Sequence, residues 1–168
     1  FQVGRKTFRV VVDFSSPNTA KQMHGGHIRS TRIGDVIARL LNFGGNEVKR
    51  DNHIGDWGTQ FGILILAIKR SKADLDYLGA DGISKLEDLD REGNQLISED
   101  ESLRKEARSE LVKLQQGEKE NLAIWEKVNA ISLASFSKVY DRLGIRFDTI
   151  LGESFYRDKV DAVYEGLT

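Results

Sequence analysis

The order of predicted elements in the first third of the chain limits its fold more than any other feature. Residues 8–14 form a run of β-branched and aromatic side chains closed by a turn over residues 15–18, which is typical of a buried strand. Apolar side chains then recur on one helical face from His27 to Phe43, and Gly44-Gly45 ends that helix because glycine adopts the left-handed cap conformation easily. Residues 46–54 predict a second strand. Strand, helix and strand in this order predict a βαβ unit with parallel strands and a right-handed crossover.

The remainder of the chain is predicted to be mainly helical. Residues 74–96 show no apolar periodicity, and the acidic stretch 74–101 is expected to be a solvated insertion or loop. Ser98, with Glu101 three residues later, is expected to cap the next helix. Gly117 should end that helix, so that it forms an antiparallel hairpin with the one that follows. We expect helices over residues 60–69, 99–116, 118–143 and 156–165, and a short strand over 146–151.

Composition excludes several classes of protein. The 168 residues are 39% hydrophobic and 30% charged, as in soluble globular proteins, and the longest apolar run, residues 63–68, is too short to cross a bilayer. The absence of cysteine excludes disulfides, thiolate metal sites and cysteine nucleophiles, and it agrees with a reducing, cytoplasmic setting. Because the sequence starts with Phe1 rather than Met, we expect it to be a piece of a longer protein.

Charge is unevenly distributed along the chain. Residues 1–70 hold 11 basic and 5 acidic side chains, whereas the remainder holds 14 basic and 21 acidic ones. A basic front part suits an anionic ligand such as a nucleotide or RNA. Simple solvation of the surface explains the same imbalance equally well.

The segment His24-Gly25-Gly26-His27 lies between the first predicted strand and the first predicted helix. A helix N-terminus presents unpaired N–H groups and the positive end of the helix dipole, which favour a phosphate. Two imidazoles at this place can donate hydrogen bonds to a triphosphate and stabilise charge that develops at the α-phosphate. Gly26 would let a base or ribose approach the backbone closely. The segment therefore predicts a nucleotide site.

Two other interpretations of this segment remain open. His24 and His27 could be ordinary loop and helix-cap residues. Alternatively, the chain's three histidines could form a metal site with Asp56, since His53 follows the second predicted strand. A loop with two glycines would order such a metal site poorly.

Three sequence blocks together resemble the catalytic domain of arginyl-tRNA synthetase, a class I aminoacyl-tRNA synthetase. D-F-S-S-P-N at residues 13–18 leads into H-x-G-H, I-R-S-T follows at 28–31, and G-D-W-G-T-Q-F-G occupies 55–62. The resemblance implies an α/β fold. Residues 1–70 would form the first half of a Rossmann-like nucleotide-binding domain, and residues 71–168 a mainly helical insertion or connective region that is incomplete at its C-terminal end.

The resemblance also implies an activity and its site. Family members activate L-arginine with ATP and Mg²⁺, release pyrophosphate and transfer the arginyl group to tRNA(Arg). His24, His27 and Lys21 would contact the ATP phosphates, and Gly26 would pass beneath the nucleotide. We expect no metal ion held by the protein alone, because phosphates hold Mg²⁺ in such reactions. Arginine would be bound by Asp13 at its guanidinium, by Asn18 at its α-amino or carboxylate end, and by Ser16 and Gln60.

Each of these roles has a plainer alternative. Asp13 could cap the turn after its strand, and Asn18 could close an Asx-turn. Lys21 could be a free surface lysine. Trp57 is expected to serve packing, and Trp125 and Tyr140 are expected to be helical core residues.

Two features depart from the family pattern. Gly25 occupies the variable position of the signature and should loosen the helix start by up to about 1 kcal/mol. Lys49-Arg50-Asp51 is polar for a second strand, which puts its burial in doubt.

The whole enzyme would be several times longer than this chain, so we expect the isolated chain not to aminoacylate. Two rival functions remain: a small-molecule nucleotidylyltransferase, which also uses H-x-G-H, and a non-catalytic RNA-binding module derived from a synthetase.

Overall fold

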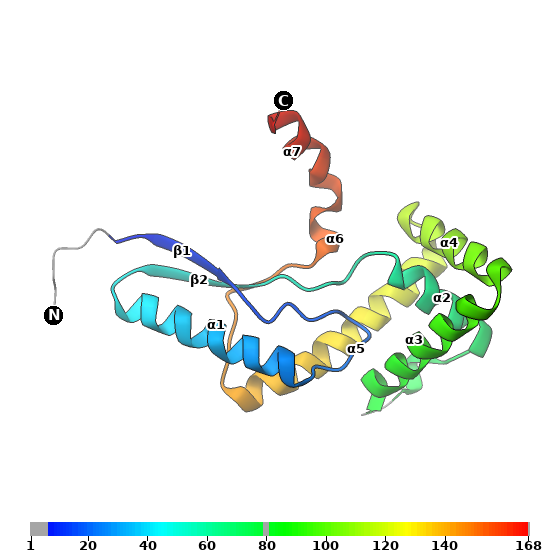
Figure 1. Ribbon diagram of the computed structural model, residues 1–168, viewed down its shortest axis with the longest axis horizontal. Coiled ribbons are helices and arrows are strands. Elements are labelled where there is room, and N and C mark those ends of the chain that lie inside the picture. The colour runs from blue at the N-terminus through cyan, green and yellow to red at the C-terminus, as the bar shows by residue number, and fades with distance from the viewer. Residues whose placement is uncertain (1–6, 79–80, 168) are drawn as a thin grey trace. The chain divides into compact units, whose positions relative to one another are not determined.

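The computed structural model describes residues 7–78 and 81–167, and these residues form two compact units (Figure 1). We call the first the sheet unit; its described residues are 7–17, 23–55 and 139–167. We call the second the helical unit; its described residues are 18–22, 56–78 and 81–138. None of the helices in the described parts of the chain has both the length and the apolar character needed to cross a bilayer.

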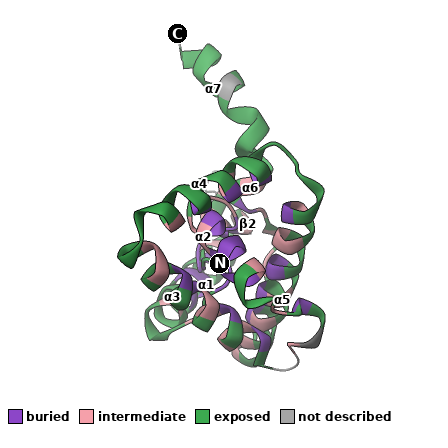
Figure 2. Cartoon of the chain, turned by 90° about the vertical axis from the view of Figure 1, so that its right-hand side faces the viewer, coloured by how far each residue is buried: buried purple, intermediate pink, exposed green. Residues whose placement is uncertain are grey.

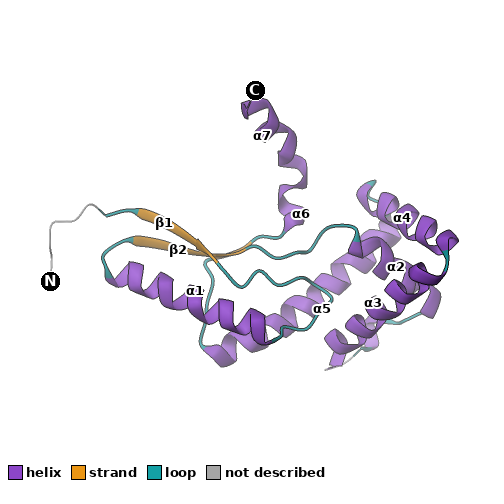
Figure 3. Ribbon diagram, viewed as in Figure 1, coloured by secondary structure: helices purple, strands orange, loops and turns teal. Residues whose placement is uncertain are grey.

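The sheet unit contains the predicted βαβ arrangement (Figure 3). Strands β1 (Arg9–Asp13), β2 (Glu47–Asn52) and β3 (Thr149–Ile150) are parallel and lie in the order β1-β2-β3. Helix α1 (Gly25–Phe43) connects β1 to β2, and Gly45, with a φ of +87°, follows its end. The strands, the helix and its glycine stop are therefore confirmed.

The C-terminal part of the sheet unit is broken into short pieces. The last helix was expected over residues 156–165. Instead α6 (Glu153–Tyr156) and a 3₁₀ turn, η3 (Arg157–Lys159), lead into α7 (Val160–Leu167). The side chains of α7 that the structure describes are all exposed (Figure 2).

Strand β1 is not buried, contrary to the expectation from its sequence. Its residues alternate between exposed and half-buried, and Val11 is 65% exposed. Alternation of this kind means that only one face of the strand is covered within the unit. The doubt about the polar second strand is confirmed, because Lys49 is exposed as well and pairs in register with Val11.

The face that α1 buries also differs from the apolar face that predicted the helix. Thr31, Gly34, Asp35 and Ala38 are buried. The apolar side chains that set the helical period are exposed: Ile33 by 50%, Val36 by 48%, Ile37 by 45% and Leu40 by 64%. Small residues on the buried face let the helix approach the chain after β1 closely. A Cβ on Gly34 would lie 2.3 Å from Cβ and Cγ of Phe14.

The helical unit consists of helices packed around an apolar core. Its elements are α2 (Gln60–Ser71), a 3₁₀ turn, η1 (Leu75–Tyr77), α3 (Gly82–Glu99), α4 (Glu101–Gln115) and most of α5 (Lys119–Leu143), which continues into the sheet unit. The core includes Phe61, Leu64, Ile65, Leu86, Leu114 and Val128, each at most 1% exposed.

Helix α3 overturns the expectation of a loop over residues 74–96. Its acidic residues and its lack of apolar periodicity predicted a solvated loop, but Leu86 is fully buried. Gly93 is a packing residue rather than a break: a Cβ there would lie 2.9 Å from Cγ2 of Ile63 on α2. The absent side chain is what lets the two helices come together.

The helix ends in this unit are partly as expected. The N-cap of α4 is Asp100, not Ser98, and its carboxylate accepts a hydrogen bond from Ser102 N–H at 2.7 Å. Serine and aspartate are both good N-caps, but the helix dipole favours the negative charge of aspartate. Gly117, with a φ of +79°, follows α4. The chain reverses there, since Asn121 Nδ2 donates to the carbonyl of Glu110.

A buried carboxylate ties three helices of the helical unit together. Only 6% of the Glu110 side chain is exposed, and Lys69 Nζ and Lys113 Nζ lie 2.8 and 2.5 Å from its oxygens. Asn121 Nδ2 donates to the same carboxylate at 3.0 Å. Burial alone would raise the pKa of Glu110, but these hydrogen bonds lower it to about 2.

We expect this carboxylate to make the stability of the chain depend on pH. A depressed pKa stabilises the fold above about pH 4.5, and this contribution, on the order of 2–3 kcal/mol, is lost as pH falls toward 2. Urea unfolding should show the free-energy gap between the wild type and Glu110→Gln shrinking between about pH 5 and 3. Glu106→Gln, at an exposed position, is the control. A gap that stays constant across this range would contradict the prediction.

Candidate functional site

His24 and His27 together cap the N-terminus of α1. Nδ1 of His24 accepts a hydrogen bond from Gly26 N–H at 3.1 Å, and Nδ1 of His27 accepts one from His24 N–H at 3.3 Å. The two rings lie with centroids 4.0 Å apart and planes 37° apart. This is a reciprocal capping box made from two imidazoles. The interpretation of these histidines as cap residues is confirmed, and it does not exclude a ligand role.

The cap also determines which ring nitrogens can donate. Because both Nδ1 atoms accept, the proton of each neutral imidazole is on Nε2. Burial and the neighbouring His24 lower the pKa of His27, which keeps its ring neutral near pH 7. Both Nε2–H groups are therefore left as donors that the cap does not use.

The start of α1 is suited to an anion. It has no acidic residue in its first turn, and the exposed Gly25 and Gly26 leave its backbone accessible. The cap itself also requires glycine at position 26, since a Cβ there would lie 2.9 Å from Cε1 of His24. A side chain at this position would push the imidazole out of its cap position.

Asp13 and Ser16 are brought together after β1. Oδ1 of Asp13 accepts hydrogen bonds from Ser16 Oγ and from the backbone N–H of His53, both at 3.3 Å. Asp13 therefore does close the turn. Within residues 7–78 and 81–167, both of its hydrogen bonds end on Oδ1, so Oδ2 is available to a ligand.

The other predicted site residues belong to the helical unit. Asn18 is exposed. Lys21, half exposed, forms an ion pair with Asp90 at 3.7 Å. Gln60 is half-buried, and its Nε2 lies 3.4 Å from the carbonyl oxygen of Trp57. The structure thus groups Asp13, Ser16, His24, Gly26 and His27 in one unit, and Asn18, Lys21 and Gln60 in the other.

The tryptophans serve packing, as expected. Trp57 and Trp125 meet edge to face with ring centroids 5.7 Å apart. Trp125 Nε1 donates to the carbonyl of Asp56 at 2.7 Å. As for the metal site considered above, the described residues contain no group of three His, Asp or Glu side chains placed to hold an ion.

One network beside the site could not be anticipated. The hydroxyl of Tyr140 lies 2.8 Å from Ser15 Oγ and accepts from Asn52 Nδ2 at 3.1 Å. Oδ1 of Asn52 accepts from the backbone N–H of Ser16 at 3.0 Å. Tyr140 is buried as predicted, but its polar end was missed, because no local pattern marks partners this far apart in sequence.

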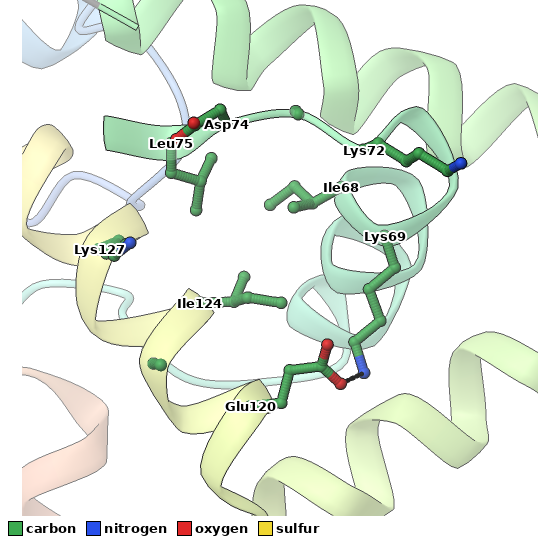
Figure 4. A pocket seen from close by; sticks show the side chains of 10 residues that line it. Ile68, Lys69, Lys72, Asp74, Leu75, Glu120, Ile124 and Lys127 are labelled. Carbon is green, nitrogen blue, oxygen red and sulfur yellow. Dashed lines mark ion pairs between the residues drawn. The ribbon is translucent and has the colours of Figure 1, made fainter. Parts of the chain in front are cut away.

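The helical unit also has a pocket of about 560 Å³ (Figure 4). Ile68, Leu75 and Ile124 contribute apolar walls, and the Lys69–Glu120 ion pair, at 2.9 Å, lies at its edge. None of the site residues predicted from the sequence lines this pocket.

Comparison with known proteins places the chain in a family. It matches the family described as tRNA synthetases class I (R), catalytic domain, over residues 2–168. The arginine–tRNA ligase of Azotobacter vinelandii is 47% identical over 161 residues, which are 95% of this chain and 27% of that protein. The arginine–tRNA ligase of Acanthamoeba polyphaga mimivirus is 43% identical, with 96% of this chain and 26% of that protein covered.

Solved structures agree with the sequence comparison. The crystal structure of arginyl-tRNA synthetase from Plasmodium falciparum matches with a TM-score of 0.74 and 36% identity, covering 95% of this chain and 26% of that one. The Thermus thermophilus arginyl-tRNA synthetase matches with a TM-score of 0.66 and 31% identity, covering 89% and 24%. The chain thus spans about a quarter of the length of these relatives. With its three parallel strands forming part of a Rossmann-like fold, the chain belongs to the catalytic-domain family of class I tRNA synthetases of the arginyl type.

Proposed function

We propose that the full-length protein carrying this sequence is an arginine–tRNA ligase. It forms arginyl-adenylate from L-arginine and ATP with release of pyrophosphate, and it passes the arginyl group to tRNA(Arg). The observation that carries the proposal is the imidazole capping box, which leaves two Nε2–H donors at the start of α1. The same proposal places the protein in the cytoplasm, where its tRNA substrate is found, and assigns the rest of the active site to the remainder of the parent chain.

In this mechanism the histidines act on the nucleotide. The arginine carboxylate attacks the α-phosphorus of ATP, a new P–O bond forms, and the bond to the bridging oxygen breaks with pyrophosphate as leaving group. His24 and His27 donate hydrogen bonds from Nε2 to phosphate oxygens, whose negative charge is also favoured by the helix N-terminus. Mg²⁺ enters as part of the substrate MgATP.

Other residues take roles that the family resemblance supports. Gly26 passes beneath the nucleotide, and Lys21, which is half exposed, binds phosphate after leaving its ion pair with the buried Asp90. Asp13 accepts the guanidinium of arginine, with Oδ2 providing the unoccupied acceptor. Ser16, Asn18 and Gln60 complete the binding of arginine.

Exchange of labelled pyrophosphate into ATP, with arginine and tRNA present, tests the proposal on the full-length protein. We expect Asp13→Asn to raise the KM for arginine about tenfold or more, because a charge-assisted hydrogen bond is lost, and to leave the KM for ATP within about twofold. Asp158→Asn, which removes an exposed carboxylate elsewhere in the sheet unit, should change neither constant.

Two outcomes would contradict the proposal and support one of the rival functions instead. Exchange that depends on a phosphorylated small alcohol instead of arginine would show a nucleotidylyltransferase. An absence of all exchange, with retained binding of RNA, would show a non-catalytic module. The isolated 168-residue chain is expected to form no arginyl-tRNA.

A further inference from the structure

The loop after β1 is held in a conformation that serine rarely adopts. Ser15 and Ser16 have φ angles of 80° and 46°, in the left-handed region that favours glycine. Two consecutive positive φ values persist only where surrounding contacts enforce them. The loop begins at Asp13 and includes Ser16, so whatever enforces its conformation also places two side chains proposed to bind arginine.

Tyr140 on α5 and Asn52 at the end of β2 provide the enforcing contacts. The tyrosine hydroxyl accepts from Asn52 Nδ2, so its single hydrogen is available for Ser15 Oγ, 2.8 Å away. Asn52 Oδ1 accepts from the N–H of Ser16. One hydroxyl and one amide therefore hold both strained residues. Asn52 is 1% exposed, and Ser15 and Tyr140 are each 6% exposed. Removing either group would leave a buried partner unsatisfied.

The position of the Tyr140 ring does not depend on its hydroxyl. The ring meets Phe147 edge to face with centroids 5.0 Å apart, and Phe147 lies against Phe14 at 4.7 Å. Burial raises the pKa of Tyr140, which keeps the hydroxyl protonated and able to donate. A phenylalanine at this position would keep the ring packing and remove only the hydrogen bonds.

We infer that Tyr140 is a positioning residue for arginine binding, acting through Ser15 and Asn52 to hold the loop that carries Asp13 and Ser16. This inference rests on the proposed arginine-activating function. The Tyr140 hydroxyl is engaged by Ser15 and Asn52, and the histidine cap at the start of α1 does not involve it. Its loss should therefore affect arginine and spare ATP.

The test is Tyr140→Phe in the full-length protein, measured by arginine-dependent pyrophosphate exchange with tRNA present. We expect the KM for arginine to rise about tenfold, with the KM for ATP within about twofold of wild type. Tyr164→Phe removes a hydroxyl from the exposed helix α7 and should leave both constants unchanged.

A rescue separates loop positioning from a general loss of stability. Adding Ser15→Gly to Tyr140→Phe supplies a residue that adopts a φ of 80° without steric cost, and it also removes the unsatisfied serine hydroxyl. The double variant should recover an arginine KM within about threefold of wild type. If Tyr140→Phe does not fold, Ser15→Ala replaces it as the single variant, with the same expected rise.

The outcomes separate a failure of this inference from a failure of the proposed function. Absence of arginine-dependent exchange in the wild-type protein overturns the proposed function. With exchange present, an unchanged arginine KM in Tyr140→Phe, an equal rise in both constants, no rescue by Ser15→Gly, or unfolding of both single variants overturns the positioning role.

Discussion

Replacing His24 by alanine is expected to slow arginine-dependent pyrophosphate exchange of the full-length protein about 100-fold. The variant loses a hydrogen-bond donor aimed at charge that develops on the α-phosphate, and such donors are worth on the order of 10²–10³ in rate. It also loses the cap on α1, which should lower the free energy of unfolding by about 1 kcal/mol. Exchange kinetics and urea unfolding measure the two losses separately.

His24→Asp decides between the capping role and the phosphate role. Aspartate is a good N-cap and is favoured by the helix dipole, so this variant should keep or exceed wild-type stability. It cannot donate a hydrogen bond at neutral pH, and its charge repels phosphate. We therefore expect its exchange rate to fall below that of His24→Ala. If His24 serves only as a cap, the aspartate variant will instead be the more active of the two, and the phosphate role is wrong.

Gly34→Ala is expected to destabilise the chain by about 3 kcal/mol, at the upper end of overpacking effects. The added Cβ would lie 2.3 Å from two side-chain carbons of Phe14, which is buried. Neither group can move freely, because Gly34 is inside α1 and Phe14 packs on Phe147. Urea unfolding measures the loss. Since Phe14 lies between Asp13 and Ser15, the KM for arginine should rise in the same variant.

Gly25→Ala is the matched control in the same helix. Nothing lies within 4 Å of a Cβ at this position, so alanine should be neutral or stabilise the helix start by up to about 1 kcal/mol. Adding Phe14→Leu to Gly34→Ala should recover part of the lost stability by making room for the new methyl group. Equal effects of Gly25→Ala and Gly34→Ala, or no recovery with Phe14→Leu, would show that crowding against Phe14 is not the cause.

Elements that are specified by residues within them or next to them could be predicted from the sequence. The β-branched run before Pro17 and the glycines after Phe43 each specify backbone conformation within a few residues, and β1 and α1 follow these signals closely. The His24–His27 segment was likewise correctly placed at a helix start, since its location depends only on the elements on either side.

Features that depend on packing against distant parts of the chain were mispredicted. Residues 74–96 were predicted to be a loop from their charge and missing periodicity, because the sequence does not show that Gly93 packs against Ile63 on α2. The apolar face that predicted α1 is not the face that the helix buries, because the sequence does not show that Gly34 packs closely against Phe14.

The amino-acid sequence by itself determined the βαβ order, the helix that starts at the histidine pair and the family resemblance, because each depends on residues that are neighbours along the chain. Only the three-dimensional structure decided which ring nitrogen of each histidine carries its hydrogen and which side chains hold the loop after β1. Those depend on hydrogen bonds with defined directions, and in the loop they join Ser15, Asn52 and Tyr140, which only folding brings within bonding distance.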